Sequence, residues 1–408
     1  MGSNWLSTDK LSSASSQARP LQGIRVLDFS RIIAGPYCAQ YLADLGADVI
    51  KVEKKGLGDD ARQYSFPAVW GGTGTMFLSF NRGKRSIALD MDLESDRLLA
   101  WEFTGHCDVL IENFRPGVMT KLGLGPDSVR ASNPGLVYCS ISGFGEDGPL
   151  AHAGANDLVA QAATGVMSLN QQEDGRPQKV VPAMVDMFTG LNAAVAIVAA
   201  IHERSSTKSG AHITTSLFEC GISMLSYFAT SHFAPPQPHD KDLGASITVP
   251  NQAFRASDGW MVVACSNEPM WQRMCEAIGK RQLRDDPRYA TNLERTRNQE
   301  TLIPMLEDVF ATATRAQWAE RLDAAKTSNS SILSVGEVLS HPQTESLGMV
   351  VPLAHPQIEE FKMLRAPFRF GGKVAASRLP PPGLDQHRQE IIAELNRPSD
   401  SPPAKNRP

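Results

Sequence analysis

A single carboxylate precedes a long run of small and apolar residues at 148–170, GPLAHAGANDLVAQAATGVMSLN, where the acid is Asp157. Asn and Asp are common at the first turn of a helix, where their oxygens accept backbone N–H groups, so the local sequence favours a capping role. A role in ligand chemistry is the alternative, because the Gly-Ala-Asn approach allows a ligand close to the backbone. No Lys or Arg lies nearby in the sequence to pair with the acid. The local sequence leaves both roles open.

Gly-rich and charged segments follow several predicted strands. These segments are SRIIAGP at 30–36, EKKGLGDD at 53–60, ENFRPG at 112–117 and SGFGEDGP at 142–149. In an open parallel sheet, ligands bind beyond the carboxyl ends of the strands, so segments that converge there predict a site for an elongated, phosphorylated ligand. No GxGxxG motif follows the first strand, and the sequence therefore predicts no nicotinamide or flavin pocket.

Alternating elements would position these segments. Short β-branched runs predict strands at 24–30, 47–54, 85–91, 108–114 and 136–144, with helical patterns between them at 35–46 and 94–106. Strands and helices that alternate at this spacing predict an α/β fold, with a parallel sheet covered by helices on both faces.

The chain of 408 residues is long enough for two domains. We predict a large α/β domain at 21–224 and a smaller α+β domain at 225–335, in which Asp258-Gly259 forms a hairpin turn and 268–325 is mainly helical. A return segment at 336–395 supplies a strand and a terminal helix that complete the large domain. Residues 1–20 and 396–408 are predicted to be flexible tails.

Composition excludes several classes of partner. With 40 basic and 44 acidic residues the net charge is −4, which predicts no nucleic-acid partner. The six cysteines form no CxxC pair, so we expect neither a zinc site, nor any other metal, nor a disulfide framework. This usage favours the cytoplasm, with the mitochondrial matrix as the alternative. The apolar run at 187–202 is short and interrupted, and it predicts a buried helix rather than a membrane partner.

Many segments in one order resemble a known family. LQGIRVLDFSRIIAGPYCAQYLADLGADVIKVEK at 21–54 is similar to the opening of the class III (CaiB/BaiF-type) CoA-transferases, and the resemblance continues through GDDAR, FNRGKRSIALDM, DVLIENFRPGVMTKLGL, NPGLVYCSISGFGEDGP, NDLVAQAATGVMSL and VPAMVDMFTGLNAA. It covers nearly all of 21–390. The resemblance implies a Rossmann-like large domain, a smaller domain, and a homodimer whose two chains interlock like linked rings.

The resemblance also implies a reaction and a nucleophile. In the transferases of this family one Asp is catalytic, and the matching position here is Asp157. A carboxylate can attack the donor thioester to give an acyl-aspartyl anhydride, and the CoA thiolate then forms an aspartyl-CoA thioester. A helix N-terminus would favour the ionised form of this acid. The substrates would be an acyl-CoA and a free carboxylic acid, with no permanently bound cofactor.

Other site residues are predicted by their place in the family motifs. The CoA contacts would be Arg31, Ile32, Ala34, Lys54, Asn113, Phe114 and Lys121. Arg62 and Arg255 are candidates for holding a distal substrate carboxylate. The loop around Gly244 is the candidate source of oxyanion-stabilising N–H groups, although formyl-CoA transferase has a run of glycines there and this chain does not.

Two other functions compete with CoA transfer. Alpha-methylacyl-CoA racemase also resembles this chain, but a racemase would require a His directly before Asp157, where Asn156 stands. Asp186 is at the place of the racemase's other catalytic acid, and we expect it to be a helix cap or a buried hydrogen-bond partner. A non-catalytic acyl-CoA-binding protein is the other alternative. Motif spacing is closest to the branch that uses succinyl-CoA with C5 dicarboxylates such as glutarate or itaconate, while formate, oxalate, carnitine and aromatic acids remain alternative acceptors.

Overall fold

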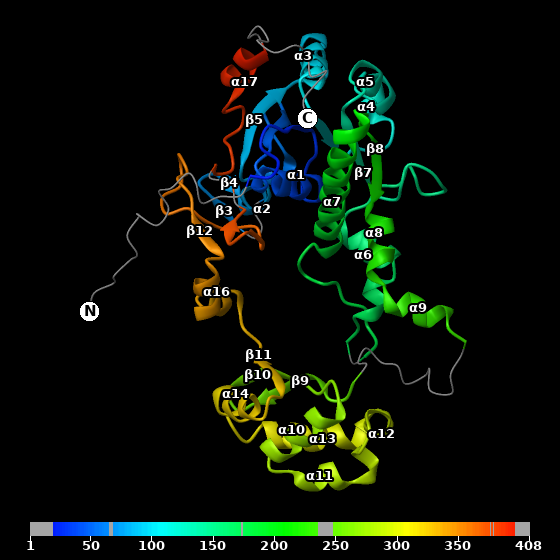
Figure 1. Ribbon diagram of the computed structural model, residues 1–408, viewed down its shortest axis with the longest axis vertical. Coiled ribbons are helices and arrows are strands. Elements are labelled where there is room, and N and C mark those ends of the chain that lie inside the picture. The colour runs from blue at the N-terminus through cyan, green and yellow to red at the C-terminus, as the bar shows by residue number, and fades with distance from the viewer. Residues whose placement is uncertain are drawn as a thin grey trace, which may run out of the picture. The chain divides into compact units, whose positions relative to one another are not determined.

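The chain forms two compact units. The computed structural model describes residues 19–64, 68–172, 174–235, 248–375, 377 and 379–395. The larger unit holds the described residues up to Ala229 and those from Gly348 onward, and the smaller unit is Thr230–Leu347 (Figure 1). We predicted a return segment from 336, but residues 336–347, which hold most of α15 (Val335–Leu339) and all of α16 (Pro342–Leu347), group with the smaller unit. The predicted tails at 1–18 and 396–408 lie outside the described residues.

A six-stranded parallel sheet forms the centre of the larger unit. Its strand order is β5-β2-β1-β6-β7-β8, and every neighbouring pair is parallel. The strands are β1 (Arg25–Asp28), β2 (Asp48–Lys54), β5 (Lys84–Leu89), β6 (Val109–Glu112), β7 (Val137–Ser142) and β8 (His212–Ser216). The parallel sheet and the five strands predicted from the sequence are confirmed. The edge strand β8 had no sequence-based prediction, because its residues HITTS lack a continuous apolar run.

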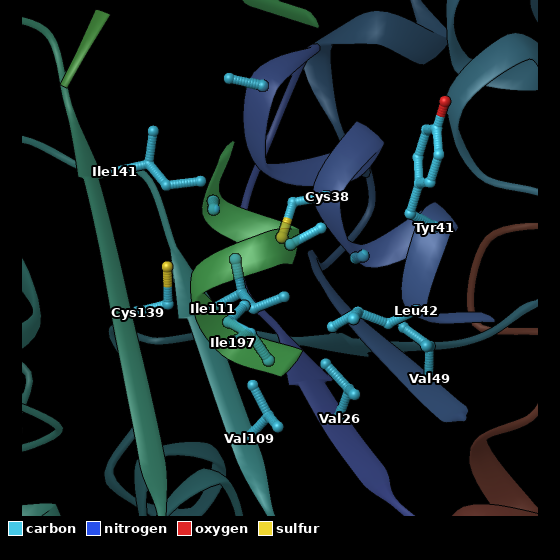
Figure 2. Packing of buried hydrophobic residues seen from close by; sticks show 14 of the residues in the cluster. Val26, Cys38, Tyr41, Leu42, Val49, Val109, Ile111, Cys139, Ile141 and Ile197 are labelled. Carbon is cyan, nitrogen blue, oxygen red and sulfur yellow. The ribbon is translucent and has the colours of Figure 1, made fainter. Parts of the chain in front are cut away.

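Alternate residues of each strand point into two separate cores. On one face, Val26, Val109 and Ile111 pack beneath helices α1 (Ala34–Asp44) and α7 (Met184–Thr207). Figure 2 shows Cys38 and Leu42 of α1 and Ile197 of α7 over these strand residues. On the other face, Leu27, Leu110 and Tyr138 pack against α3 (Glu94–Gly105), α5 (Pro126–Ser132) and α17 (Arg388–Leu395). Both faces are covered, as expected for a parallel sheet.

Helix α7 is longer than predicted and is buried on only one face. It covers 24 residues, and its buried side includes Val185, Ala193 and Ile197. Gly190 allows a close approach to α1, because a Cβ at this position would lie 2.4 Å from the carbonyl oxygen of Ala34. The opposite side carries exposed apolar residues, so the expectation of a buried helix is right for one face and wrong for the other. Among the described helices, α7 alone is long and apolar enough to cross a membrane by length and composition.

The remaining elements of the larger unit are short. They are α2 (Thr75–Phe80), α4 (Val118–Lys121), α6 (Asp157–Ala163), α8 (Leu217–Met224), the 3-10 turns Asp60–Arg62 and Val166–Leu169, and the strand pairs β3 (Val69–Trp70) with β4 (Thr73–Gly74), β12 (Val350–Pro352) with β13 (Lys362–Leu364) and β14 (Arg369–Phe370) with β15 (Lys373–Val374). Helix α9 (Tyr227–Phe233) spans the boundary between the two units. Helix α17 packs on β5, where Arg85 binds Glu394 at 2.8 Å. The predicted return of the chain to the large unit is therefore anchored by an ion pair.

The smaller unit combines a short antiparallel sheet with helices. Strands β9 (Asn251–Ala256), β10 (Gly259–Ala264) and β11 (Ser328–Ser331) pair in the order β11-β10-β9. The Asp258-Gly259 turn joins β9 to β10, as predicted. Besides α15 and α16, its helical elements include α10 (Glu268–Ala277), α11 (Arg281–Asp285), the 3-10 turn Pro287–Tyr289, α12 (Asn292–Arg297), α13 (Gln299–Phe310) and α14 (Arg315–Ala324). This unit has its own core, which includes Phe254, Trp271 and Trp318.

Candidate active site

The Asp157 carboxylate binds the first turn of a different helix from its own. Asn156 is the N-cap of α6, and its Oδ1 accepts the Val159 N–H at 3.0 Å. Asp157 is the first residue of α6, and its Oδ1 accepts the backbone N–H groups of Val185 at 2.9 Å and Asp186 at 3.2 Å. Both N–H groups belong to the N-terminus of α7, whose own N-cap, Ala183, supplies no side-chain acceptor. The local sequence favoured Asp157 as the cap of the helix that follows it, which is wrong because Asn156 caps that helix and Asp157 binds the first turn of α7 instead.

A buried glutamine holds the other oxygen of this carboxylate. Gln161 lies one turn after Asp157 on α6, and its Nε2 donates to Asp157 Oδ2 at 2.6 Å. The Gln161 amide also pairs with the backbone of Val180: Oε1 accepts the Val180 N–H at 2.9 Å, and Nε2 donates to the Val180 carbonyl at 3.1 Å. These two contacts determine which end of the amide faces Asp157. The carboxylate is thus held by three donors in one orientation.

A second acid lies beside this arrangement. Asp186 is in the first turn of α7, and burial, with a further contribution from the Asp157 carboxylate, raises the pKa of Asp186 to about 7. No described residue donates a hydrogen bond to the Asp186 carboxyl. It is therefore neither the helix cap nor the hydrogen-bond partner that the sequence suggested. The described residues contain no cluster of three or more His, Cys, Asp or Glu arranged to hold a metal ion.

An apolar cavity of about 470 Å³ lies in the same unit, next to α7. Its walls include Tyr37, Tyr41, Phe80 and Met187. Met187 is two residues after Val185, so one turn of α7 contributes both to the binding of Asp157 and to the cavity wall.

The loop after β1 is held by its neighbours at the carboxyl edge of the sheet. Asn113, just after β6, pairs with the backbone of Arg31: its Oδ1 accepts the Arg31 N–H and its Nδ2 donates to the Arg31 carbonyl, both at 2.8 Å. The amide of Asn113 is therefore used within the protein, and this residue positions the loop. The Arg31 guanidinium is exposed, lies 4.9 Å from the Phe114 ring centre and pairs with Asp60 at 3.3 Å.

Ile32 has a backbone conformation that β-branched residues rarely adopt. Its φ is 71°, and its N–H donates to both carboxylate oxygens of Asp59, at 3.1 and 3.2 Å. Backbone strain of this kind persists only where the surroundings impose it, and it is frequent at ligand sites. The same turn requires glycine at position 35, because a Cβ there would lie 2.1 Å from the Cβ of Ser30.

Buried ion pairs anchor this strained loop. Lys51 Nζ contacts Asp59 at 2.9 Å and donates to the Ser30 carbonyl at 2.8 Å, and both charged side chains are almost fully buried. Burial is the largest influence on Asp59 and opposes its ionisation, but the Lys51 charge together with hydrogen bonds from Ala61, Lys51 and Ile32 lowers the pKa of Asp59 below its usual value. The reciprocal interaction raises the pKa of Lys51 despite burial. Beside this pair, Lys84 binds Asp28 at 2.9 Å.

Arg62 pairs with an acid inside the protein. Its Nε and one terminal nitrogen each donate to Glu53 at 2.7 Å, the same nitrogen reaches the Pro382 carbonyl, and the guanidinium lies 3.6 Å from the Phe77 ring centre. The side chain is 8% exposed. Arg62 is therefore a member of the buried charge network, and its contact with a substrate carboxylate stays a prediction.

The other predicted contacts take different positions. Lys54 ends β2 and Lys121 ends α4, and both are exposed. Ala34 is buried at the start of α1. Phe114 is half-buried, and its N–H donates to Glu112 Oε2 at 2.8 Å, so it is less exposed than a free stacking platform would be.

Two predicted residues belong to other parts of the sequence. Arg255 is exposed on β9 of the smaller unit, with its guanidinium 5.6 Å from the Trp260 ring centre. Gly244 lies outside the described residues. Their proposed roles remain predictions.

Comparison with known proteins decides the family. The family model described as CoA-transferase family III matches residues 21–388, and therefore most of the chain. The chain belongs to CoA-transferase family III. It is an enzyme of this class, and its substrates are CoA thioesters.

Relatives of this CoA-transferase cover almost its whole length. It is 34% identical to succinyl-CoA:glutarate CoA-transferase of Mus musculus, over 97% of this chain and 91% of the relative. It is 33% identical to succinate–glutarate CoA-transferase of Agrobacterium fabrum, over 92% of this chain and 96% of the relative. Its fold matches the crystal structure of a CAIB/BAIF family protein from Brucella suis with a TM-score of 0.82 and 35% identity, over 93% of this chain and all of that chain.

Several residues that shape the site of this CoA-transferase were missed. Gln161 follows Asp157 by four positions, a spacing at which helical side chains meet, so a search for i,i+4 partners could have found it. Lys51 and Asp59 were read as part of a strand and of a charged loop, and no local pattern shows that they pair. The N–H groups of Val185 and Asp186 carry no side-chain signal at all.

Replacing Gln161 tests whether it positions the carboxylate. Gln161→Glu removes the donor and places a second carboxylate next to that of Asp157, and the two like charges repel each other. We expect kcat to fall roughly 10- to 100-fold, with KM for the acyl-CoA little changed, because small displacements of a reacting group are costly. Gln171→Glu is the matched control, since it makes the same change in an exposed side chain that bonds the Ser168 carbonyl. Equal kcat values for both variants would contradict the positioning role.

Replacing Asp186 tests its raised pKa through stability. In the unfolded chain this carboxyl ionises near its usual pKa of 3.8, and in the folded chain near 7. The folded state therefore binds more protons between these values, and the contribution of Asp186 to stability falls as pH rises through that window. Urea unfolding should show that the free energy of unfolding of Asp186→Asn rises relative to that of the parent between pH 5 and pH 8, by on the order of 1–2 kcal/mol. A difference that does not change with pH would show that the carboxyl titrates normally.

Proposed function

We propose that this enzyme transfers CoA from succinyl-CoA to a C5 dicarboxylate such as glutarate or itaconate, with Asp157 as the covalent nucleophile. The observation that carries the proposal is the carboxylate itself, which three donors hold at the N-terminus of α7. Donors of this kind hold the carboxylate in a single orientation, which positions it for attack. The choice of succinyl-CoA and a C5 acid is supported by the names of the mouse and Agrobacterium relatives.

The proposed chemistry needs no redox step and no metal. The Asp157 carboxylate attacks the thioester carbonyl, and the C–S bond breaks to give an acyl-aspartyl anhydride and CoA thiolate. The thiolate then attacks the aspartyl carbonyl, which gives an aspartyl-CoA thioester and the free donor acid. The acceptor acid runs the two steps in reverse and leaves as its CoA thioester. Each two-step exchange converts one CoA thioester into another, so the free energies of its starting compound and product are similar.

The predicted CoA contacts divide into residues that bind CoA and residues that shape its binding loop. Arg31, Lys54 and Lys121 present exposed charges near the carboxyl edge of the sheet, as contacts to phosphate groups require. Asn113 and Ile32 act differently, because the Asn113 amide and the Ile32 N–H already bind within the protein. We assign these two residues to shaping the CoA-binding loop.

The exposed side of α7 supports assembly with a second copy of the chain. Leu191, Val195 and Val198 follow helical spacing and are 39%, 63% and 36% exposed. An apolar stripe of this kind commonly marks an interface. The homodimer that the family resemblance implies would cover it.

Light scattering tests this assembly. The parent should have the mass of a dimer, and Val195→Glu should shift the mass toward the monomer, because a charge would be buried in the interface. Leu98→Glu is the control, since Leu98 is 62% exposed on α3, on the other face of the sheet. A monomeric parent at micromolar concentration would refute the dimer.

Asn156 is the observation that disfavours racemisation. Its side chain caps α6 through the Val159 N–H, so the position next to Asp157 offers no group that takes up and returns a proton. A non-catalytic acyl-CoA-binding protein would bind the ester but exchange no label between a free acid and the thioester.

Substrate and nucleophile can be tested together. Succinyl-CoA incubated with a panel of acids should give new thioesters with ping-pong kinetics, fastest for C5 dicarboxylates. Hydroxylamine trapping during turnover should modify the peptide that carries Asp157, as peptide mass spectrometry would show. Asp157→Ala should lose transfer by several orders of magnitude, whereas Asp308→Ala, at an exposed acid on α13, should not. Modification of a different peptide, or an Asp157→Ala variant of parental rate, would refute the mechanism.

A further inference from the structure

The donors around Asp157 do more than orient it. Its Oδ1 accepts two N–H groups from the same helix turn, from Val185 at 2.9 Å and Asp186 at 3.2 Å. Helix α7 is 24 residues long, and the Ala183 side chain does not satisfy these groups. Two converging N–H groups at the start of a long helix are suited to stabilising negative charge on the oxygen that they contact.

We infer that the backbone N–H groups of Val185 and Asp186 form the oxyanion hole for attack on the aspartyl carbonyl. The inference deepens the proposed function and rests on it. It concerns the second half of each exchange, in which CoA thiolate attacks Cγ of the acylated Asp157. The sequence also predicts oxyanion-stabilising N–H groups in the loop around Gly244. That prediction does not specify whether they act on the aspartyl carbonyl or on the substrate carbonyl.

The electron flow identifies the oxygen that needs stabilising. A sulfur lone pair forms the new S–Cγ bond, and the π electrons of the aspartyl carbonyl move onto its oxygen. When the tetrahedral species collapses, this pair reforms the carbonyl and the bond from Cγ to the bridging oxygen breaks. The electron pair of the broken bond stays on the bridging oxygen, and the acid leaves as a carboxylate. No proton is transferred, so the negative charge on the carbonyl oxygen must be stabilised by hydrogen bonds.

The geometry indicates which oxygen becomes the carbonyl. Oδ1 has two donors from α7, whereas Oδ2 has one, the Gln161 amide, whose orientation Val180 fixes. Oδ2 is therefore the less restrained oxygen and becomes the bridging atom of the anhydride. Oδ1 remains against the helix as the carbonyl oxygen.

These donors act selectively on one step. The carbonyl oxygen of a neutral anhydride is a weak acceptor, and the oxyanion that forms from it is a strong one, so the hydrogen bonds strengthen as the thiolate attacks. In the earlier step the same donors stabilise the free carboxylate and thus do not assist its attack on the donor thioester. The two steps should respond oppositely when a donor is removed.

An amide-to-ester substitution at Val185 removes the donor and leaves the side chain in place. The probe is succinyl-CoA in rapid-quench experiments, with intact-protein mass spectrometry to distinguish the succinyl adduct from the CoA adduct. We expect the succinyl anhydride to form at the parent rate or faster, and the aspartyl-CoA thioester to form about 10²- to 10³-fold more slowly. The anhydride should therefore accumulate.

The control is the same substitution at Met187. Its N–H donates to the Ala183 carbonyl at 3.0 Å, so the same helix turn loses a hydrogen bond that does not involve Asp157. Formation of aspartyl-CoA at the parent rate in the Val185 ester, or equal slowing in the Met187 ester, would overturn the oxyanion hole. If the parent carries neither adduct on Asp157, the proposed function itself fails, and the inference fails with it.

Discussion

The hydrogen bonds between the Asp157 carboxylate and the first turn of α7 connect the site to the fold. They join α6 to a helix that begins 27 residues after Asp157, across a segment whose Val180 is itself bound by Gln161. Helix α7 in turn packs closely on α1, where Gly190 lies against the Ala34 carbonyl. Because α1 begins at the loop after β1, one carboxylate is tied through two helices to the predicted CoA-binding loop. A cap and a nucleophile are compatible roles, since both require an ionised acid.

Buried charges fix the other half of the site. The buried pairs are Lys51 with Asp59, Lys84 with Asp28, and Arg62 with Glu53, and they join strands of the sheet to each other and to the loop after β2. Removing one partner of a buried pair commonly costs about 3–5 kcal/mol, because the other charge is left unpaired. The pairs here hold backbone groups as well as each other: Asp59 binds the Ile32 N–H and Lys51 binds the Ser30 carbonyl. The network therefore specifies the shape of the loop that carries Arg31.

Local patterns in the sequence predicted what depends on local physics. The β-branched runs predicted five strands of the sheet, Asp258-Gly259 predicted the hairpin, and the residues after the strands pointed to one edge. Contacts between distant segments were not predictable in this way. Nothing in the sequence near Asp157 reveals that Val185 supplies its donors, and Arg62 looked available because its partner Glu53 is nine residues earlier, in a strand. The length of α7 was underestimated because the helix extends beyond the apolar run at 187–202, from Met184 to Thr207, and its last residues are polar.

The central claim is that Asp157 exchanges its own oxygen atoms with the carboxylic acid substrates. In the anhydride mechanism, the bridging oxygen of an incoming acid stays on the aspartyl carboxylate when CoA thiolate attacks the acid carbonyl. Turnover with a heavy-oxygen-labelled acceptor acid, followed by mass spectrometry of the digested protein, measures this directly. The account predicts heavy oxygen in the peptide that contains Asp157 and in no other. Efficient formation of the new thioester without label in that peptide would contradict it.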